Sequence, residues 1–163
     1  MHRFFVLVMA VAVGCVSAHG ILPLQVEQSI PNDAKAVELH STSPPDKYFR
    51  TVYQKLLEEG YSIEHDNQDM GTLTTGFKDI EQETILQISA FVKGEEGGSV
   101  ATLRGKWGAS ASMRAGFSAS MGMDASGTGD VKWGGMGRPG LGFASMVKTA
   151  MAIPHDSLRY RTE

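Results

Sequence analysis

The chain has 163 residues, with 15 lysines and arginines against 18 aspartates and glutamates, and a formal net charge of −3. A chain of this length predicts one domain with a modest hydrophobic core. Because the charge is mildly acidic, it gives no electrostatic attraction to nucleic acid or anionic lipid, so we expect no nucleic-acid partner. The composition departs from the average in its 19 glycines and 9 methionines, which concentrate in the second half.

The first 18 residues have the pattern of an export signal, with Arg3 before the apolar run 4–13 and small residues after it. An apolar run of this length is about half of what spans a bilayer, so a permanent transmembrane helix is not expected. We therefore expect an exported protein, either periplasmic or associated with the outer membrane of a Gram-negative bacterium, or alternatively secreted.

The single cysteine, Cys15, leaves two processing routes open. In one, an ordinary signal peptidase removes residues 1–18 and the cysteine with them. In the other, residues 12–15 resemble the bacterial lipobox, so that residues 1–14 are removed and Cys15 carries a lipid anchor, the only membrane attachment we expect. In both routes the mature domain has no cysteine pair, so packing alone must stabilise it.

Residues 16–33 show no sustained hydrophobic period and contain Pro23 and Pro31, which predicts a flexible tether. The folded domain is expected over residues 34–153. It opens with a strand at residues 34–40, where apolar and polar residues alternate.

A helix is predicted over residues 45–59. Ser43 and Pro44 give its start signal, with Ser43 as the expected cap of the free backbone amides. Gly60 is expected to end the helix in the left-handed conformation. The apolar residues between these ends have helical spacing and form one stripe, namely Phe49, Val52, Tyr53, Leu56 and Leu57.

Alternating apolar and polar residues predict further strands at 61–65, 72–77, 84–92 and 99–107, joined by short polar turns. The turn at 66–71 contains carboxylates and a glycine, as calcium-binding loops do. Its spacing does not match such a loop, so we predict a β-turn there and no metal site.

Residues 108–129 consist mostly of Gly, Ala, Ser and Met, which predicts a mobile loop. The motif at 104–108 is echoed at 130–134, which suggests a hairpin around this loop; coincidence in a Gly-rich tract is the alternative. Methionines can bind soft copper ions, but no Met-x-x-Met array is present and no metal is expected. The apolar side chains of the region are instead predicted as ligand or partner contacts, namely Trp107, Trp133, Met113, Met121, Met123 and Phe117.

Residues 140–153 have helical spacing and are closed by Pro154, which predicts a C-terminal helix. Residues 154–163 are polar and are predicted to be a loose tail. The expected fold class is therefore α+β: an antiparallel sheet of four to six strands, with one N-terminal amphipathic helix packed on one face and a C-terminal helix.

The segment 46–77 resembles the repeating unit of small bacterial envelope lipoproteins, in which a strand and an amphipathic helix lead into a Leu-x-x-x-Gly-Tyr-x-Ile turn and an acidic hairpin. Among these it is most similar in pattern to a lipoprotein component of the outer-membrane β-barrel assembly machinery that has helix-grip domains. The resemblance implies a non-catalytic adaptor or binding role, and the Gly- and Met-rich second half departs from the family pattern. The matching residues are Leu56, Gly60, Tyr61, Ile63, Asp66 and Gly71.

No nucleophile elbow, phosphate loop or paired metal-ligand spacing is found, so we expect no catalytic residue and no cofactor. The leading hypothesis is a structural or interaction protein of the bacterial cell envelope, adaptor-like, whose partners are other envelope proteins. The alternative is a periplasmic small-ligand binder that uses a groove between helix and sheet, with Trp107 and Trp133 as an aromatic wall. An enzyme with dispersed carboxylates is the third class.

Overall fold

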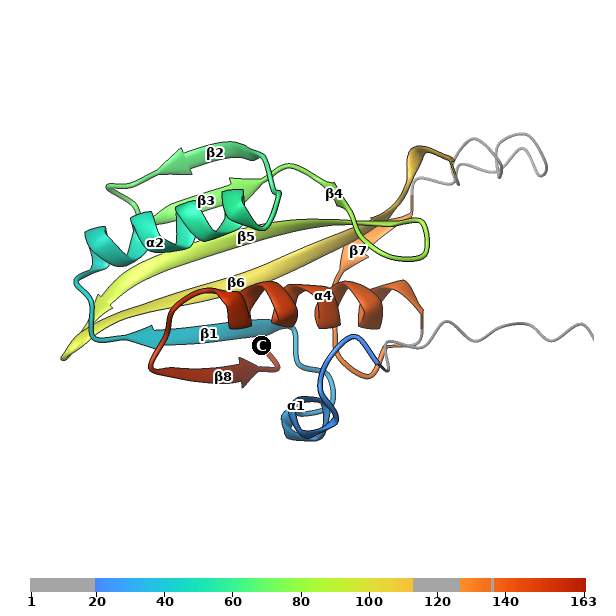
Figure 1. The fold of residues 1–163 in the computed structure, drawn as a ribbon, viewed down its shortest axis with the longest axis horizontal. Coiled ribbons are helices and arrows are strands. Elements are labelled where there is room, and N and C mark those ends of the chain that lie inside the picture. The colour runs from blue at the N-terminus through green and yellow to red at the C-terminus, as the bar shows by residue number, and fades with distance from the viewer. Residues whose placement is uncertain (1–19, 113–126, 136) are drawn as a thin grey trace, which may run out of the picture.

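The structure is a computed structural model that describes residues 20–112, 127–135 and 137–163. Its centre is one antiparallel sheet of eight strands in the order β2-β3-β5-β6-β1-β8, with β4 paired to β5 and β7 paired to β6 (Figure 1). The strands are β1 (Ala36–Ser41), β2 (Ile63–Asn67), β3 (Thr72–Thr75), β4 (Lys78–Asp79), β5 (Thr84–Glu95), β6 (Gly98–Ala109), β7 (Thr128–Asp130) and β8 (Ser157–Arg161).

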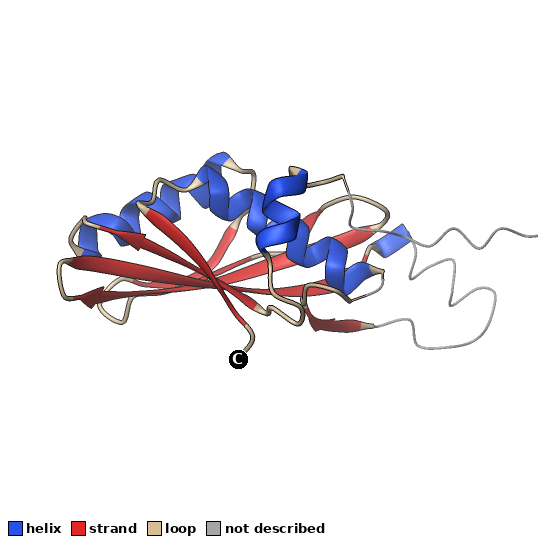
Figure 2. Cartoon of the chain, turned by 90° about the horizontal axis from the view of Figure 1, so that it is seen from below, coloured by secondary structure: helices blue, strands red, loops and turns tan. Residues whose placement is uncertain are grey.

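Two long helices, α2 (Pro45–Glu58) and α4 (Arg138–Ala152), lie on the same face of the sheet (Figure 2). The predicted helix 45–59 and the predicted C-terminal helix are both confirmed, as is the α+β fold class. Gly60 follows α2 with a φ of +82°, the left-handed conformation expected of a helix stop. The cap prediction is wrong, because the N-cap residue is Pro44 and makes no side-chain hydrogen bond.

The β5–β6 hairpin contains the two longest strands of the sheet. Each strand has 12 residues, and the pairing runs without interruption from Thr84 opposite Ala109 to Glu95 opposite Gly98. The alternation that predicted the first of these strands is borne out, because every second side chain is buried beneath the helices. The buried side chains of β5 are Thr84, Leu86, Ile88, Ala90 and Val92.

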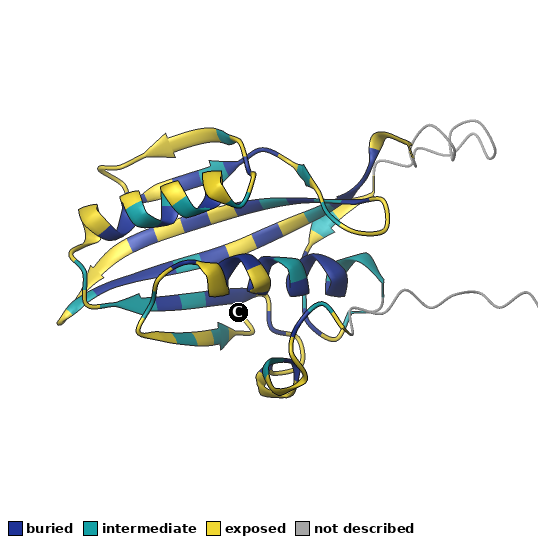
Figure 3. Ribbon diagram, viewed as in Figure 1, coloured by how far each residue is buried: buried dark blue, intermediate teal, exposed yellow. Residues whose placement is uncertain are grey.

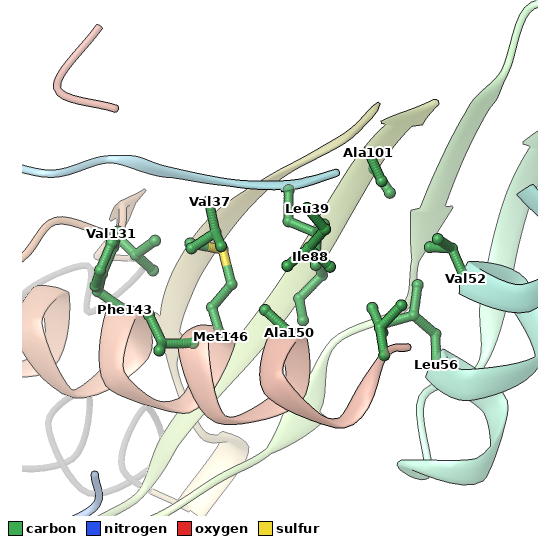
Figure 4. Close-up of a cluster of buried hydrophobic side chains, with 14 of the residues drawn as sticks. Val37, Leu39, Val52, Leu56, Ile88, Ala101, Val131, Phe143, Met146 and Ala150 are labelled. Atoms are coloured by element: carbon green, nitrogen blue, oxygen red, sulfur yellow. The ribbon is translucent and has the colours of Figure 1, made fainter. Parts of the chain in front are cut away.

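The hydrophobic core fills the space between the sheet and the two helices (Figure 4). Strand β1 contributes Val37 and Leu39, both fully buried between β6 and β8. The helices contribute most of the apolar stripes that their spacing predicted, but Leu57 of the predicted α2 stripe is 46% exposed, so its place in the stripe is wrong. The labelled residues of the helices are Val52 and Leu56 from α2, and Phe143, Met146 and Ala150 from α4.

Two glycines allow α4 to approach β6 closely. A Cβ atom at Gly105 of β6 would lie 2.8 Å from Val131 Cγ2, and one at Gly142 of α4 would lie 2.7 Å from Val131 Cγ1. Both distances are shorter than van der Waals contact, so Val131 fits between strand and helix only because neither position carries a side chain. Glycine has a low helix propensity, which made the predicted helix weaker. In the structure, however, the packing of α4 on Val131 requires a glycine at position 142.

The predicted tether is wrong for residues 20–33. A short helix, α1 (Leu24–Ser29), lies in this segment, and Leu22 and Ile30 on either side of it are buried in the core. The backbone is held as well, since the amide of Asp33 donates to the carbonyl oxygen of Trp133 at 3.2 Å. Leu22 and Ile30 belong to no helical or strand period, so the sequence did not predict their burial.

The predicted loose tail is also wrong, and it explains part of the error in the strand count. Residues Ser157–Arg161 form β8, which pairs antiparallel with β1 and places Leu158 and Tyr160 against the core. The sheet has eight strands instead of four to six because the short strands β4 and β8 were not predicted, and β7 was suggested only as a possible hairpin arm beside β6. Each of them is stabilised by pairing with a longer strand and not by its own alternation.

The prediction of a mobile loop over residues 108–129 is wrong at both ends of this range. Gly108 and Ala109 belong to β6, and Thr128 and Gly129 belong to β7, which pairs antiparallel with β6. The predicted return of the chain beside β6 is therefore observed, although Trp133 lies beyond the paired strand. The rest of the predicted loop, residues 113–126, lies outside the described residues, as do Cys15 and the whole predicted export signal.

Candidate functional site

The two faces of the sheet have different surroundings. In β5, and in β6 from Ala101 to Lys106, buried residues alternate with half-buried or exposed ones (Figure 3). The buried set faces α2 and α4, whereas the other set points to the side of the sheet that carries no long helix (Figure 2). We call this second side the open face.

The strand register arranges the open face in two rows that cross five strands. The antiparallel pairing places side chains of directly opposite residues on the same side of the sheet. One row consists of Thr72, Phe91, Thr102, Glu38 and Arg159, and the neighbouring row consists of Thr74, Ser89, Arg104, Ala36 and Arg161.

A hollow of about 460 Å³ lies on the open face. It spans strands β3, β5, β6, β1 and β8, so residues far apart in the sequence meet in it. The residues that line it are Glu38, Thr72, Leu73, Thr74, Ser89, Ala90, Phe91, Lys93, Thr102, Arg104 and Arg161. Most of them are polar, which suits a surface that binds a partner from water.

The charged groups of the hollow are mainly basic. Arg161 Nη1 lies 2.9 Å from Glu38 Oε1, and the Glu38 side chain is only 15% exposed. Arg104 Nη2 donates to the backbone oxygen of Glu163 at 3.0 Å. Lys93 Nζ lies 3.2 Å from a carboxylate at the rim, Glu95 Oε1. The lining itself thus contains three basic residues and one acidic residue, although acidic residues outnumber basic ones in the chain.

Phe91 is the apolar residue of the hollow that solvent reaches most easily. It is 44% exposed and sits between Thr72 of β3 and Thr102 of β6 in the register of the sheet. An aromatic ring at the centre of a polar, basic surface offers a contact for an apolar side chain of a partner.

A second polar cluster lies where β1 and β8 meet the β5–β6 turn. His40 Nδ1 is 3.7 Å from Glu95 Oε2, and Asp156 Oδ2 accepts a hydrogen bond from the amide of Thr42 at 2.7 Å. A smaller hollow of about 180 Å³ is found there. Within the described parts of the chain, no group of three or more histidine, cysteine, aspartate or glutamate residues is arranged to hold a metal ion.

Tyr48 of α2 is a buried polar residue that the sequence did not single out. Burial raises the pKa of its hydroxyl to about 12, with a smaller contribution from the negative charge of Asp156. The hydroxyl has no hydrogen-bond partner among the described residues. It therefore contributes to packing, and its ionisation is disfavoured in the folded protein.

The two tryptophans lie on the helix side of the sheet. Trp133 is 8% exposed, and its ring packs on Phe143 of α4 with 6.2 Å between the ring centroids. Trp107 is half-buried; its indole lies beside Gly129 of β7, and its Cβ lies beside Gly142 in α4. Both thus serve the packing of α4. The other predicted contact residues, Met113, Met121, Met123 and Phe117, lie outside the described residues.

The interface between helices and sheet, where the sequence suggested a ligand groove, is occupied by core side chains. A small hollow of about 170 Å³ remains between α4 and the segment that follows α2. Lys78 Nζ lies 4.8 Å from the centre of the Tyr61 ring there, and burial raises the pKa of the Tyr61 hydroxyl. This hollow is smaller than the one on the open face.

The open face was missed by sequence reasoning, although part of its signal was present. In strand 84–92 the residues out of phase with the buried set include the polar Gln87 and Ser89 and the exposed Phe91. The residues of the open face come together only through the order of the strands in the sheet. This order cannot be read from the local pattern of any one strand. No protein-family model matches the chain, and no curated protein matches it.

Proposed function

We propose that this chain is a non-catalytic, exported interaction protein of the bacterial cell envelope, with an adaptor-like role, and that the open face is its binding surface. The observation that carries the proposal is the asymmetry of the sheet. One face is sealed by α2 and α4, whereas the other presents a hollow of about 460 Å³ with basic and aromatic side chains.

The different surroundings of the two faces support this proposal. The hydrophobic core cluster lies on the helix side, and among the residues of the two open-face rows only Ala36 is fully buried. The other side chains of these rows are therefore not needed to exclude water from the core. Polar and charged side chains on this face lower the stability of the fold very little, because they lie outside the core. They are therefore available for recognition. A broad, shallow surface crossing several strands suits a protein partner better than a small molecule, which prefers a deep and mostly apolar cavity.

The cellular location is part of the proposal and rests on the sequence alone. No helix in the described parts of the chain is both long and apolar enough to cross a membrane. Mass spectrometry of the mature N-terminus tests the location. A diacylglyceryl or triacyl group on Cys15 supports a lipid anchor, a chain that begins at His19 supports a secreted or periplasmic form, and an unprocessed Met1 contradicts export.

Site-specific photo-crosslinking in living bacterial cells tests the binding surface. A photoreactive phenylalanine analogue replaces Phe91 on the open face or Leu57 on α2, two positions with matched exposures of 44% and 46%. We expect discrete crosslinked products from position 91 only, identified by mass spectrometry. Identical products from both positions, or none from position 91, would contradict the proposal.

The small-ligand hypothesis has less support. Its predicted groove between helix and sheet is filled by core side chains, and Trp133 packs on Phe143 in that interface. We therefore do not propose a second function.

A further inference from the structure

We propose that the open face binds an acidic polypeptide segment in an extended conformation, with carboxylates paired to Arg104 and Arg161 and an apolar side chain on Phe91. This inference rests on the proposed interaction function and specifies the chemistry of the partner. Three features of the hollow carry it: its charge, its hydrogen-bond donors and its dimensions.

The charge of the hollow differs in sign from the charge of the chain. Lys93, Arg104 and Arg161 line it together with one carboxylate, Glu38, whereas the whole chain has a formal charge of −3. Arg159 extends the basic surface, since it lies opposite Glu38 in the register of β8. A local excess of positive charge on an acidic protein attracts an anionic partner and repels a basic one.

Both arginines have donors to spare. A guanidinium group has five N–H donors, and each of these side chains makes one hydrogen bond to the described residues, Arg161 to Glu38 and Arg104 to the backbone oxygen of Glu163. The remaining donors can form the two-pronged contact with carboxylate that arginine favours.

The dimensions match a short extended segment. Five strands at about 4.8 Å spacing give a surface roughly 19 Å across, which about six residues of extended chain would cover. Alternate side chains of such a segment point to the same side, so carboxylates can reach the arginine row while an apolar side chain reaches Phe91.

Other anionic partners fit the surface less well. A planar bilayer presents anionic headgroups at its surface but no apolar side chain to pack on the exposed Phe91 ring. A uronic-acid polymer supplies carboxylates, but it lacks an apolar side chain to bury the exposed part of the Phe91 ring. The polypeptide is therefore the partner that uses both the charge and the aromatic residue.

Fluorescence anisotropy with labelled peptides tests the inference on the folded protein. The probe is a peptide of about eight residues in which glutamates alternate with leucine and glycine, and the control peptide has lysines in place of the glutamates. We expect saturable binding of the acidic probe alone, weakened by salt. Substitution Arg104→Ala and, separately, Phe91→Ala should each lower the affinity at least about 10-fold.

The matched control is Arg50→Ala, which removes an exposed arginine from α2 on the opposite layer and should leave the affinity unchanged. Equal binding of the lysine peptide, or equal losses with the control variant, would overturn the inference. Displacement of the probe by polyglucuronate or anionic vesicles, with affinity no weaker than that of the peptide, would assign the face to a glycan or a membrane instead.

The two proposals can fail separately. If no acidic peptide binds but crosslinked products still form from position 91 and not from position 57, the interaction function stands and the acidic partner is wrong. If the acidic peptide binds with unchanged affinity to Phe91→Ala and Arg104→Ala, the open face does not bind it and the further inference fails. The interaction proposal fails as well only if position 91 gives no crosslinked products.

Discussion

The two faces of the sheet are built from the same strands but from different residues. In β5, Ile88 is fully buried beneath the helices, while its neighbour Ser89 points to solvent. In β6, the same contrast separates Leu103 from Arg104. The comparison shows how one strand can contribute to stability with one side and to recognition with the other, since successive side chains point in opposite directions. Substitutions on the helix side should therefore affect folding, and substitutions on the open face should affect binding.

The largest effect is expected from Leu56→Asp in α2. Leu56 is fully buried, so the substitution places a carboxylate in the core without a partner. We expect a loss of more than about 4 kcal/mol, with no cooperative thermal transition by circular dichroism.

Leu57→Asp is the matched control, because the neighbouring leucine of the same helix is 46% exposed. It should melt within a few degrees of the parent. Similar melting of both variants would mean that α2 does not present the stripe through Leu56 to the sheet.

High pH should destabilise the protein through Tyr48. Its pKa in the folded state is about 12 against an ordinary value of 10.0, so the neutral hydroxyl is favoured by folding. Stability is unaffected below pH 10.0 and falls as the pH rises toward 12, because the unfolded chain releases the proton first. The expected loss is about 2 to 3 kcal/mol, measured by urea unfolding across this range.

The variant Tyr48→Phe separates the alkaline loss of stability due to Tyr48 from the loss due to other groups. Its hydroxyl has no partner among the described residues, so the variant should fold with nearly unchanged stability at neutral pH. Its alkaline loss should be smaller but not zero, because burial also raises the pKa of Tyr61 and Tyr160. An alkaline loss equal to that of the parent would show that Tyr48 is not buried as described.

An intermediate effect is expected from Gly105→Ala on the helix side of β6. The added Cβ would lie 2.8 Å from Val131 Cγ2 and 3.2 Å from Met146 Sδ, so α4 must move or the side chains must leave their rotamers. Overpacking of this kind costs about 1 to 3 kcal/mol, measurable by chemical denaturation. Gly94→Ala in β5 is the control, since its Cβ meets only Pro45 Cγ at 3.6 Å, an ordinary contact. If the two variants lose equal stability, α4 does not pack on β6 at this distance.

The smallest effect on folding is expected from Phe91→Ala on the open face. Phe91 is already 44% exposed and lies outside the core, so truncation should cost less than about 1.5 kcal/mol, well below the 3 to 5 kcal/mol typical of a buried phenylalanine. A thermal melt checks this value. A loss as large as that of a buried residue would mean that the open face is part of the folding core.

Much of the helix side could be predicted from the sequence. The stripe through Leu56 and the alternation through Ile88 are local patterns, and both face the core as predicted, except that Leu57 at the edge of the stripe is exposed. The short strand β8 could not be predicted, because Ser157–Arg161 becomes a strand only through its pairing with β1. The same holds for α1, whose flanking Leu22 and Ile30 find their places only when the core exists.

The candidate site was hidden for a related reason. Its residues come from strands separated in the sequence, and Arg161 meets Glu38 only because β8 lies beside β1. The tryptophans were predicted as contact residues because of their residue type, but Trp133 is a core residue. Residue type indicates where recognition can occur, whereas the order and register of the strands decide where it does.

Methyl NMR of threonine tests the account most directly, because threonines lie on both faces of the sheet. Thr72, Thr74 and Thr102 point to the open face, whereas Thr75, Thr84 and Thr149 are buried. On titration with the acidic peptide, we predict chemical-shift changes in the first three methyl groups and none in the last three. Shifts in the buried methyl groups alone, or no shift in any of the six at saturating peptide, would contradict the claim that the open face is the binding surface.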